Sequence, residues 1–294
     1  MKKGFILTMI GAIFWAFSGA CGQYLFDSKN LPEDWVVVVR MFSAGAILSI
    51  FCFFKDKNKF FDIFFNKKDF IELLMFSIFG IALCQGSYIK AIANSNAATA
   101  TVLQYLGPIF IVIYVCVKQL KLPSLYEFLA IVSSIVGTFL LSTGGNINSL
   151  KISKEGLILG LISAFGLVFY TLIPQRIMKK YSILLCLGLG MTIGSFFSTI
   201  VLNPFKDKPV IDEKVIFAMI LIVWFGTILA FYAYLKGVEL IGPVYASLVA
   251  CLEPVGATVF SAILGTKFTF MDILGIVLII LTITLLGLNS KKES

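Results

Sequence analysis

Residues 80–108 read GIALCQGSYIKAIANSNAATATVLQYLGP, and residues 226–254 read GTILAFYAYLKGVELIGPVYASLVACLEP. Each stretch is an apolar run that ends in a Tyr-x-Lys motif, followed by a short break and a second apolar run with a proline near its middle. A shift of 146 residues superimposes these landmarks: Tyr88 on Tyr234, Lys90 on Lys236 and Pro108 on Pro254. Because the shift is close to half the chain, the sequence predicts a duplicated unit.

The composition indicates a membrane protein. The 294 residues are 59% hydrophobic and 14% charged, whereas a soluble domain is roughly a quarter charged. Apolar runs of about 20 residues recur from end to end, and each is long enough to cross the hydrocarbon core of a bilayer as a helix. We therefore expect an all-α membrane protein.

These runs predict ten transmembrane helices, arranged as a first five-helix repeat at residues 1–145 and a second at residues 150–294. The predicted spans are Phe5–Leu25, Trp35–Phe54, Phe70–Ile92, Ala97–Val117, Leu125–Leu141, Gly156–Ile173, Ile183–Leu202, Val215–Leu235, Val244–Leu264 and Phe270–Leu288. An odd number of spans per half places the second half upside down in the membrane. Two inverted five-helix repeats are an architecture on which alternating access is commonly built.

The basic residues predict the orientation. With the N-terminus inside, roughly twice as many Lys and Arg residues face the cytoplasm as face the outside. Both termini are then expected to be cytoplasmic, in a multi-pass protein of the plasma or inner membrane. The longest connection, Lys55 to Asp69, is basic and aromatic, and we expect it to lie along the membrane surface.

Several other classes of protein fit the sequence poorly. The net charge of +8 is explained by these topogenic residues, so no nucleic-acid partner is expected. The chain has no histidine, and its six cysteines are scattered singly, so we expect neither a metal site nor a cofactor. We find no activated nucleophile, no catalytic residues and no glycine loop for phosphate, which argues against an enzyme.

The order of several short motifs resembles the drug/metabolite transporter superfamily, in particular its EamA-type ten-helix transporters. The motifs are Gly11-x3-Trp15, Pro32 with Arg40, Tyr88-x-Lys90-Ala91 before Pro108, Tyr234-Leu235-Lys236-Gly237, Leu252-Glu253-Pro254-Val255 and Leu274-Gly275-x2-Leu278-Ile279. The resemblance implies a central cavity between the halves, with spans 5 and 10 at the periphery. It also implies export of small metabolites or amino acids, although some members import and others exchange their substrates.

Two charged residues are predicted well inside spans, Arg40 and Glu253. A charge near the bilayer centre costs about 2.5–3.5 kcal/mol on insertion scales and is typically retained where it faces a cavity or a partner. Glu253 is either a proton-coupling carboxylate, the counter-charge for a substrate amine, or a structural glutamate bonded to a neighbouring helix. Arg40 binds a substrate carboxylate, extends to the outer headgroups, or pairs with an acid such as Glu253.

Polar and aromatic residues at helical spacing complete a predicted cavity lining. The candidate substrate-binding residues are Trp15, Arg40, Gln85, Tyr88, Gln104, Tyr105, Trp224, Tyr232, Tyr245 and Glu253. Aromatic residues near span ends also suit an interfacial belt, and the two glutamines also suit hydrogen bonds between helices. Pro108 and Pro254 each lack an N–H and crowd the carbonyl four residues before them, so each is either a hinge or a static kink.

Together these features predict a secondary active transporter that exports a small metabolite, such as an amino acid, by alternating access with proton coupling. The alternative is an importer or exchanger of small metabolites on the same fold. The expected partners are the small-molecule substrate, the lipid bilayer and protons, and a homodimer remains open.

Overall fold

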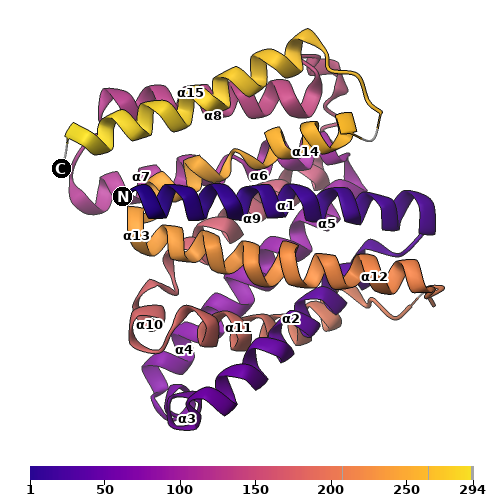
Figure 1. The fold of residues 1–294 in the computed structure, drawn as a ribbon, viewed down its shortest axis with the longest axis vertical. Coiled ribbons are helices and arrows are strands. Elements are labelled where there is room, and N and C mark those ends of the chain that lie inside the picture. The colour runs from indigo at the N-terminus through magenta and orange to yellow at the C-terminus, as the bar shows by residue number, and fades with distance from the viewer. Residues whose placement is uncertain (207, 264, 293–294) are drawn as a thin grey trace.

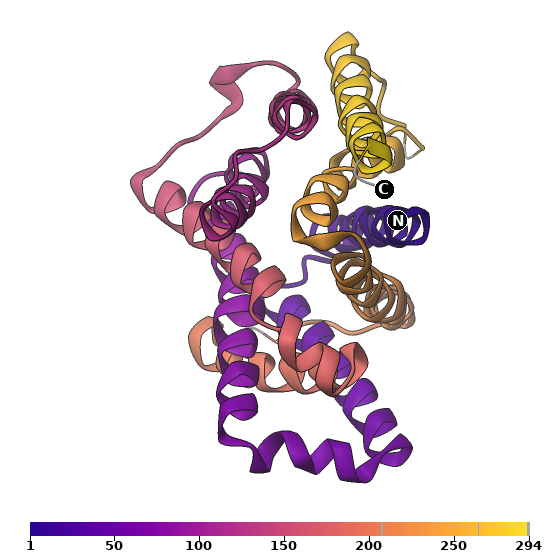
Figure 2. The same cartoon turned by 90° about the vertical axis from the view of Figure 1, so that its left-hand side faces the viewer.

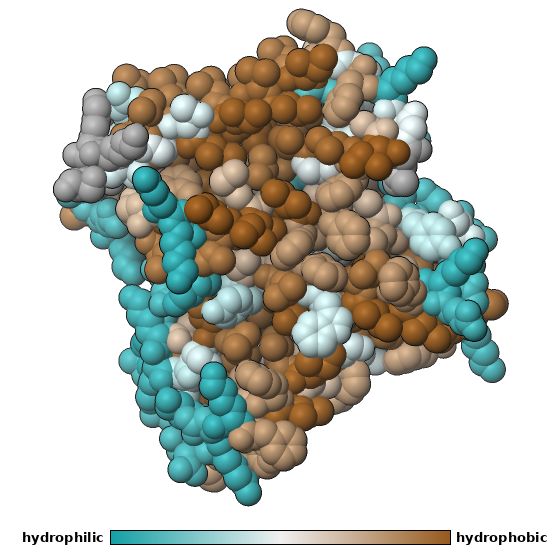
Figure 3. All heavy atoms as spheres, in the orientation of Figure 1, coloured by the Kyte–Doolittle hydropathy of each residue, from teal (hydrophilic) through white to brown (hydrophobic). Residues whose placement is uncertain are grey.

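The chain folds into a bundle of helices that is apolar on its outer surface as well as inside. The computed structural model describes residues 1–206, 208–263 and 265–292, and this part of the chain contains no β-strand. Figure 3 shows a broad hydrophobic belt across the middle of the molecule, with hydrophilic residues gathered towards two opposite ends. Such a belt suits the hydrocarbon core of a bilayer, where helices satisfy their own backbone groups. The chain is an all-α membrane protein.

The helices follow one another with short connections. The first half contains α1 (Lys2–Lys29), α2 (Glu33–Lys55), α3 (Lys57–Phe65), α4 (Lys67–Met75), the π-helical η1 (Phe76–Ala82), α5 (Leu83–Asn94), α6 (Ala97–Gln104), α7 (Gly107–Gln119) and α8 (Leu125–Thr143). The second half contains the 3-10 turn η2 (Ile147–Ser149), α9 (Lys154–Leu172), α10 (Gln175–Lys180), α11 (Ile183–Leu202), α12 (Glu213–Leu221), the π-helical η3 (Ile222–Leu229), α13 (Ala230–Ala250), α14 (Glu253–Ile263) and α15 (Phe270–Lys292).

The bundle has two ends, which we name by the course of the first helix. The amino end is where α1 begins and α15 finishes, and it carries the connection between α2 and α3 (Figure 1). The distal end is where α1 finishes, and it carries the connections 30–32 and 95–96.

The described residues make ten crossings. Nine helical segments are long and apolar enough to span a membrane, and one of them, Glu213–Ala250, has 38 residues. At 1.5 Å per residue it would be about 57 Å long as a straight helix, but the chain turns at Gly242, where φ is 80° and ψ is 163°. The segment therefore holds the eighth crossing and the start of the ninth, which continues in α14. The end that we predicted for this span, Leu264, lies outside the described residues, as do the last residues of the predicted second repeat, 293–294.

Both halves repeat the same unusual features at the offset of 146 residues. The π-helical segments begin at Phe76 and at Ile222. Each half also contains a span broken by two residues: Tyr105-Leu106 between α6 and α7, and Cys251-Leu252 between α13 and α14. Longer π-helical segments are rare, so their coincidence supports a duplicated five-helix unit.

The two breaks have a chemical cause. Pro108 has no N–H to donate to the carbonyl of Gln104, and α6 ends at Gln104. Pro254 stands in the same relation to Ala250, where α13 ends. In each half the proline thus starts a new helical segment near the middle of a span.

Helices of one half pack against helices of the other half. α1 packs on α13, and the equivalent pair in the inverted arrangement is α9 on α5. α2 packs on α11, and α8 packs on α15, so each of these helices meets its own counterpart. Figure 1 shows α8 and α15 together at one edge of the bundle, as the resemblance implied. The core between the halves is therefore built by both repeats.

Close approach of the halves depends on glycine at two equivalent positions. A Cβ added to Gly80 in η1 would lie 2.8 Å from the Cα of Tyr170 on α9. A Cβ added to Gly226 in η3 would collide with Ser18 on α1. Each π-helical segment thus contacts the first helix of the opposite half through a residue without a side chain.

Candidate functional site

A polar cluster lies at the two helix breaks, where the halves meet. The hydroxyl of Tyr105, in the first break, donates a 3.0 Å hydrogen bond to Oε2 of Glu253, which begins α14 after the second break. Both side chains are partly buried. The bond connects residues 148 positions apart in the chain, and so it directly joins the two repeats.

Arg40 brings a positive charge to the same cluster. Its Nη2 donates a 2.5 Å hydrogen bond to Oε1 of Gln85, while its buried Nε has no hydrogen-bond partner. Arg40 and Glu253 lie close enough to interact electrostatically. The cluster therefore presents a guanidinium with a free donor and a carboxylate, both away from bulk water.

Gln104 continues the cluster towards α9. Its Nε2 donates to Oγ of Ser163 at 2.7 Å, and that hydroxyl donates in turn to the backbone carbonyl of Cys84 at 3.1 Å. Gly166 allows α9 to approach, because a Cβ there would lie 2.6 Å from the Cα of Cys84. This chain of bonds fixes α5, α6 and α9 relative to one another.

A crevice leads from the distal end towards this cluster. It has a volume of about 350 Å³ and lies between α6, α8 and α14. Its wall includes Thr101, whose hydroxyl is 2.9 Å from that of Tyr88, and Pro254, the neighbour of Glu253. Lys267 and Asp272 also contribute to its lining. The crevice thus reaches from the distal end to Pro254, the residue next to Glu253.

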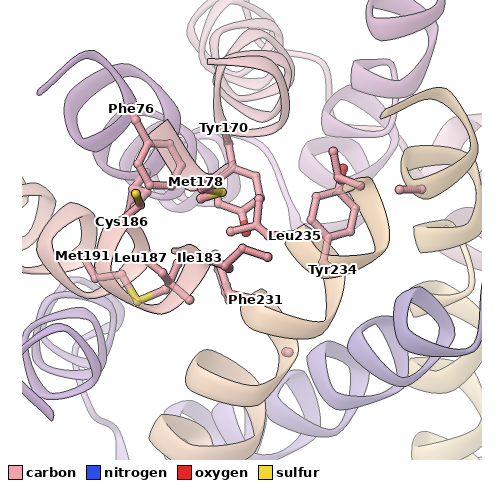
Figure 4. Close-up of a cluster of buried hydrophobic side chains, with 14 of the residues drawn as sticks. Phe76, Tyr170, Met178, Ile183, Cys186, Leu187, Met191, Phe231, Tyr234 and Leu235 are labelled. Carbon is pink, nitrogen blue, oxygen red and sulfur yellow. The ribbon is translucent and has the colours of Figure 1, made fainter. Parts of the chain in front are cut away.

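Packed aromatic rings fill the space between α1, η1, α9 and α13. Figure 4 shows Phe76, Tyr170, Phe231 and Tyr234 gathered from η1, α9 and α13. Tyr170 stacks on Phe76 and Tyr234 at ring distances of 5.7 and 5.8 Å, and Trp15 contacts Phe231 edge-on at 5.2 Å. We call these five residues the aromatic plug. The Tyr170 hydroxyl and the Trp15 Nε1 are buried without a hydrogen-bond partner, which makes the plug a costly arrangement to keep closed.

An ion-pair network holds the amino end beyond the plug. Asp69 on α4 is 1% exposed, and its carboxylate lies 2.7 Å from Arg176 Nη2 and 2.5 Å from Lys180 Nζ on α10. Arg176 also binds Glu72 at 2.7 Å, and Tyr181 donates to Asp69 at 2.6 Å. Burial, followed by the hydrogen bond to Asp69, raises the pKa of Tyr181. These contacts connect the third span, in the first half, to the end of the sixth span, in the second half. We call the five residues the amino-end latch: Asp69, Glu72, Arg176, Lys180 and Tyr181.

The distal end has connections of its own. Lys29, the last residue of α1, pairs with Asp212, which caps α12 by accepting from the backbone N–H of Val215 at 2.8 Å. The hydrogen bond from Lys29 lowers the pKa of Asp212. The acidic partner is more exposed here than in the latch, since 45% of the Asp212 side chain is accessible and 1% of the Asp69 side chain. Further contacts hold the same end: Lys90 pairs with Asp34 at 3.9 Å, and Ser153 donates to the backbone carbonyl of Asn94 at 2.6 Å.

The predicted site residues fall into three groups. Arg40, Gln85, Tyr88, Gln104, Tyr105 and Glu253 are linked in or beside the polar cluster, and Trp15 lies in the plug. Trp224 is 47% exposed on the outer surface of η3, and Tyr232 is half-buried at the edge of the core. Tyr245 is buried near the amino end, where Asn289 donates to its hydroxyl at 2.7 Å. Pro108 and Pro254 are buried at the starts of α7 and α14.

A polar cluster at two broken spans, between two inverted repeats, is the arrangement in which carriers typically bind their substrates. A model of the EamA-like transporter family matches residues 2–143 and, a second time, residues 154–288. The chain belongs to the EamA-like transporter family. The membership confirms the resemblance to the drug/metabolite transporters and the architecture of two repeats, and it makes the chain a membrane transporter.

Relatives of this EamA-like chain are known as transporters. YicL of Salmonella typhimurium, named as an uncharacterized inner membrane transporter, is 37% identical over 100% of this chain and 98% of its own length. An uncharacterized transporter of Clostridium kluyveri is 23% identical over 100% of this chain and 96% of its own length. A solved crystal structure superimposes with a TM-score of 0.82 at 13% identity, over 100% of this chain and 99% of its own; that likeness shows the fold alone.

Sequence reasoning missed several residues of the EamA-like site. Ser163 and Cys84 are not among the predicted site residues, because nothing in the order of the chain indicates that Gln104 lies beside them. Asp69 was expected in a surface connection, although it is among the most buried polar residues. Among the described residues there is no group of three His, Cys, Asp or Glu side chains that could hold a metal ion.

Proposed function

We propose that this protein is a secondary active transporter that exports a small zwitterionic metabolite, such as an amino acid, by alternating access. The observation that carries the proposal is the hydrogen bond from Tyr105 to Glu253, which joins the two broken spans. Discontinuous spans near the midplane are where carriers typically place their substrates. A bond between two such breaks responds directly to movement of one repeat against the other.

The charges in the cluster suggest the class of substrate. Arg40 has a buried Nε without a partner, and a guanidinium is well suited to bind a carboxylate through two parallel donors. Glu253 has one oxygen on Tyr105 and a second that is available for a substrate amine. A molecule with both groups at a short separation would satisfy both charges at once, whereas an ion of one sign would leave the other charge unsatisfied.

Proton coupling follows as part of the same proposal. When the substrate amine leaves, the carboxylate of Glu253 loses its counter-charge in a site shielded from water. A proton taken up at that moment neutralises it, since an unpaired buried charge is expensive. Substrate and proton would therefore occupy Glu253 alternately, and the movement of one would drive the movement of the other.

The two ends of the bundle provide the gates in this proposal. The aromatic plug and the amino-end latch close one path, and the crevice leaves the other path open to the distal end. Because the repeats are inverted, each can adopt the conformation that the other has now. This exchange of conformations would open the amino end and close the distal end. With both termini in the cytoplasm of an inner or plasma membrane, the present state is open to the outside.

Efflux measurements test the proposal. Cells that overproduce the protein are loaded with an amino-acid mixture, and each compound is followed in the medium against cells with an empty vector. Faster release of one class of zwitterion, abolished by Glu253→Ala, is expected. Faster uptake or retention would instead establish an importer or exchanger on the same fold. Transport of an uncharged compound that does not depend on either Arg40 or Glu253 would overturn the assignment of the site.

A further inference from the structure

The short helix α3 runs across the amino end of the bundle. In Figure 2, which looks towards that end, α1 is seen along its axis while α3 lies in the plane of the picture below it. The axis of α3 is therefore nearly perpendicular to α1, and thus parallel to the surface of a membrane that α1 crosses. The helix is held there from one side, because Ile63 is 0% exposed and Phe60 packs against the core.

Aromatic rings form the corner between α2, α3 and α4. Phe53 contacts Phe60 edge-on at 5.5 Å, and Phe60 contacts Phe64 at 5.9 Å. Phe64 in turn contacts Phe70 on α4 at 5.7 Å. These contacts fix the orientation of α3, so the face that it turns away from the bundle is also fixed.

That outer face is apolar in its centre. Phe54 is 81% exposed and Phe65 is 84% exposed, and Phe61 beside them is 41% exposed. Exposed phenylalanine rings are costly in water, at about 25 cal/mol for each Å² of apolar surface. At the boundary of a bilayer the same rings would lie among acyl chains.

Basic residues surround these rings. Five lysines in and beside α3 are exposed: Lys55, Lys57, Lys59, Lys67 and Lys68. The nearby Asp56 is already engaged, since it caps α3 through the backbone N–H of Lys59 at 3.1 Å and lies 3.4 Å from the Lys59 ammonium. The hydrogen bond from that N–H lowers the pKa of Asp56. Asp62 on α3 is also exposed, so five lysines face two acidic residues here and the surface keeps an excess of positive charge.

We propose that α3 and its flanking residues form a binding site for an anionic phospholipid, with the lysines on the headgroup phosphate and the exposed phenylalanines on the acyl chains. A juxtamembrane cluster of four or more lysines is suited to anionic headgroups. An acidic protein would match the charge but would leave the three rings in water or in a second apolar contact. A single lipid molecule can contact both the lysines, through its headgroup, and the phenylalanine rings, through its acyl chains.

This lipid site is connected to the amino-end latch through the backbone. α3 leads through the single residue Asn66 into α4, and α4 carries Asp69 and Glu72 of the amino-end latch. A lipid that fixes α3 in the membrane plane also fixes the start of α4. The binding site itself does not depend on the transported substrate or on the direction of transport.

The test is lipid binding to the purified protein in a non-ionic detergent, measured by native mass spectrometry. The probes are phosphatidylglycerol and, at equal concentration, phosphatidylcholine. We expect phosphatidylglycerol to be retained preferentially, and the triple variant Lys55→Gln, Lys57→Gln, Lys59→Gln to bind it about tenfold more weakly. The matched control is Lys206→Gln, Lys208→Gln, Lys214→Gln, which removes the same charge near the distal end and should bind like the wild type.

Two further experiments distinguish a specific lipid site from non-specific attraction between lysines and anions. Phe54→Ala with Phe65→Ala should weaken phosphatidylglycerol binding, whereas Phe217→Ala on α12, a phenylalanine that is also exposed, should not. Free glycerol phosphate should not displace the lipid. Equal loss in both triple variants, equal binding of phosphatidylcholine, or displacement by glycerol phosphate would overturn the proposal.

Discussion

Tyr105 and Glu253 join the two halves through positions that are not equivalent. At the offset of 146 residues Tyr105 corresponds to Cys251, and Glu253 corresponds to Gly107. The inverted repeats are alike in backbone, with a break at the same place in each, but only one of the two equivalent helix starts carries a carboxylate. The chemistry of the site is thus asymmetric within a nearly symmetric frame.

Glu253→Gln separates charge from hydrogen bonding at this site. The glutamine oxygen can still accept from Tyr105, but the side chain can no longer take up and release a proton. We expect transport to become independent of pH and its rate to fall about tenfold or more, because a charge-assisted bond contributes roughly 1.5–3 kcal/mol. Initial rates in proteoliposomes, measured from mildly acidic to mildly alkaline pH, check this. Trp224→Phe, on the outer surface, should behave like the wild type; an unchanged pH profile for Glu253→Gln would contradict the coupling.

The energy of the bond between the breaks can be measured by a double-mutant cycle. Tyr105→Phe removes the donor, Glu253→Gln removes the charge of the acceptor, and the double variant removes both. Because the side chains are in direct contact, we expect a coupling energy of about 0.5–3 kcal/mol in apparent substrate affinity. Additive effects within error would mean that the two residues act independently.

Asp69→Asn should open the amino end more often. The substitution removes the charge that holds Arg176 and Lys180 while leaving a side chain of the same shape. In a variant whose only cysteine is Cys84, we expect a membrane-impermeant thiol reagent applied from the amino end to label faster. Vesicles of both orientations distinguish the two sides. Identical labelling of wild type and variant from the amino end would show that these ion pairs do not hold the gate.

The ion pair of Lys29 and Asp212 should stabilise the protein near neutral pH but not in strong acid. Asp212 has a lowered pKa because Lys29 donates to it, so the pair stabilises the fold above the ordinary aspartate pKa and stops doing so as the pH falls through the lowered value. Asp212→Asn removes the charge but keeps an oxygen for the N–H of Val215. The melting temperature of the wild type should exceed that of the variant near neutral pH, and the two should converge once the pH is below the lowered pKa of Asp212. A difference that persists in strong acid would have to come from something other than the charge.

Gly80→Ala tests the contact between η1 and α9. The added methyl would press on the backbone of Tyr170, which cannot move aside as a side chain can, so we expect a loss of about 1–3 kcal/mol in stability. Gly19→Ala on α1 is the matched control, since no heavy atom lies within 4 Å of the added Cβ. The control should be neutral or slightly stabilising, as alanine favours a helix over glycine. Thermal unfolding in detergent measures both; equal melting temperatures would exclude the proposed clash.

Much of the fold could be predicted because span boundaries follow from where charged and breaking residues interrupt apolar runs. The seventh span, Ile183–Leu202, has the same ends in the structure as in the prediction. The eighth was expected to stop at Leu235, but the helix continues to Gly242, since Lys236 and Glu239 pair with each other at 2.8 Å along its surface. Charged residues at the end of an apolar run can thus pair with each other within a helix that continues beyond the run.

The site was less predictable. Arg40 and Glu253 attract notice because charges are rare in apolar runs. Gln85 stands out in the same way, but its role as the partner of Arg40 depends on how α2 packs beside α5. Ser163 carries no such signal, since a hydroxyl in a helix can bond its own backbone. Residue type indicated which positions are chemically unusual, and only the packing of the repeats showed which of them meet.

The π-helical segments η1 and η3 also record the history of the chain. A π-helical turn accommodates an extra residue without a break in the helix, so it is the trace that a single-residue insertion leaves behind. The same trace at the same place in both repeats is most simply explained by one insertion in an ancestral five-helix protein, before its gene was copied and joined to itself.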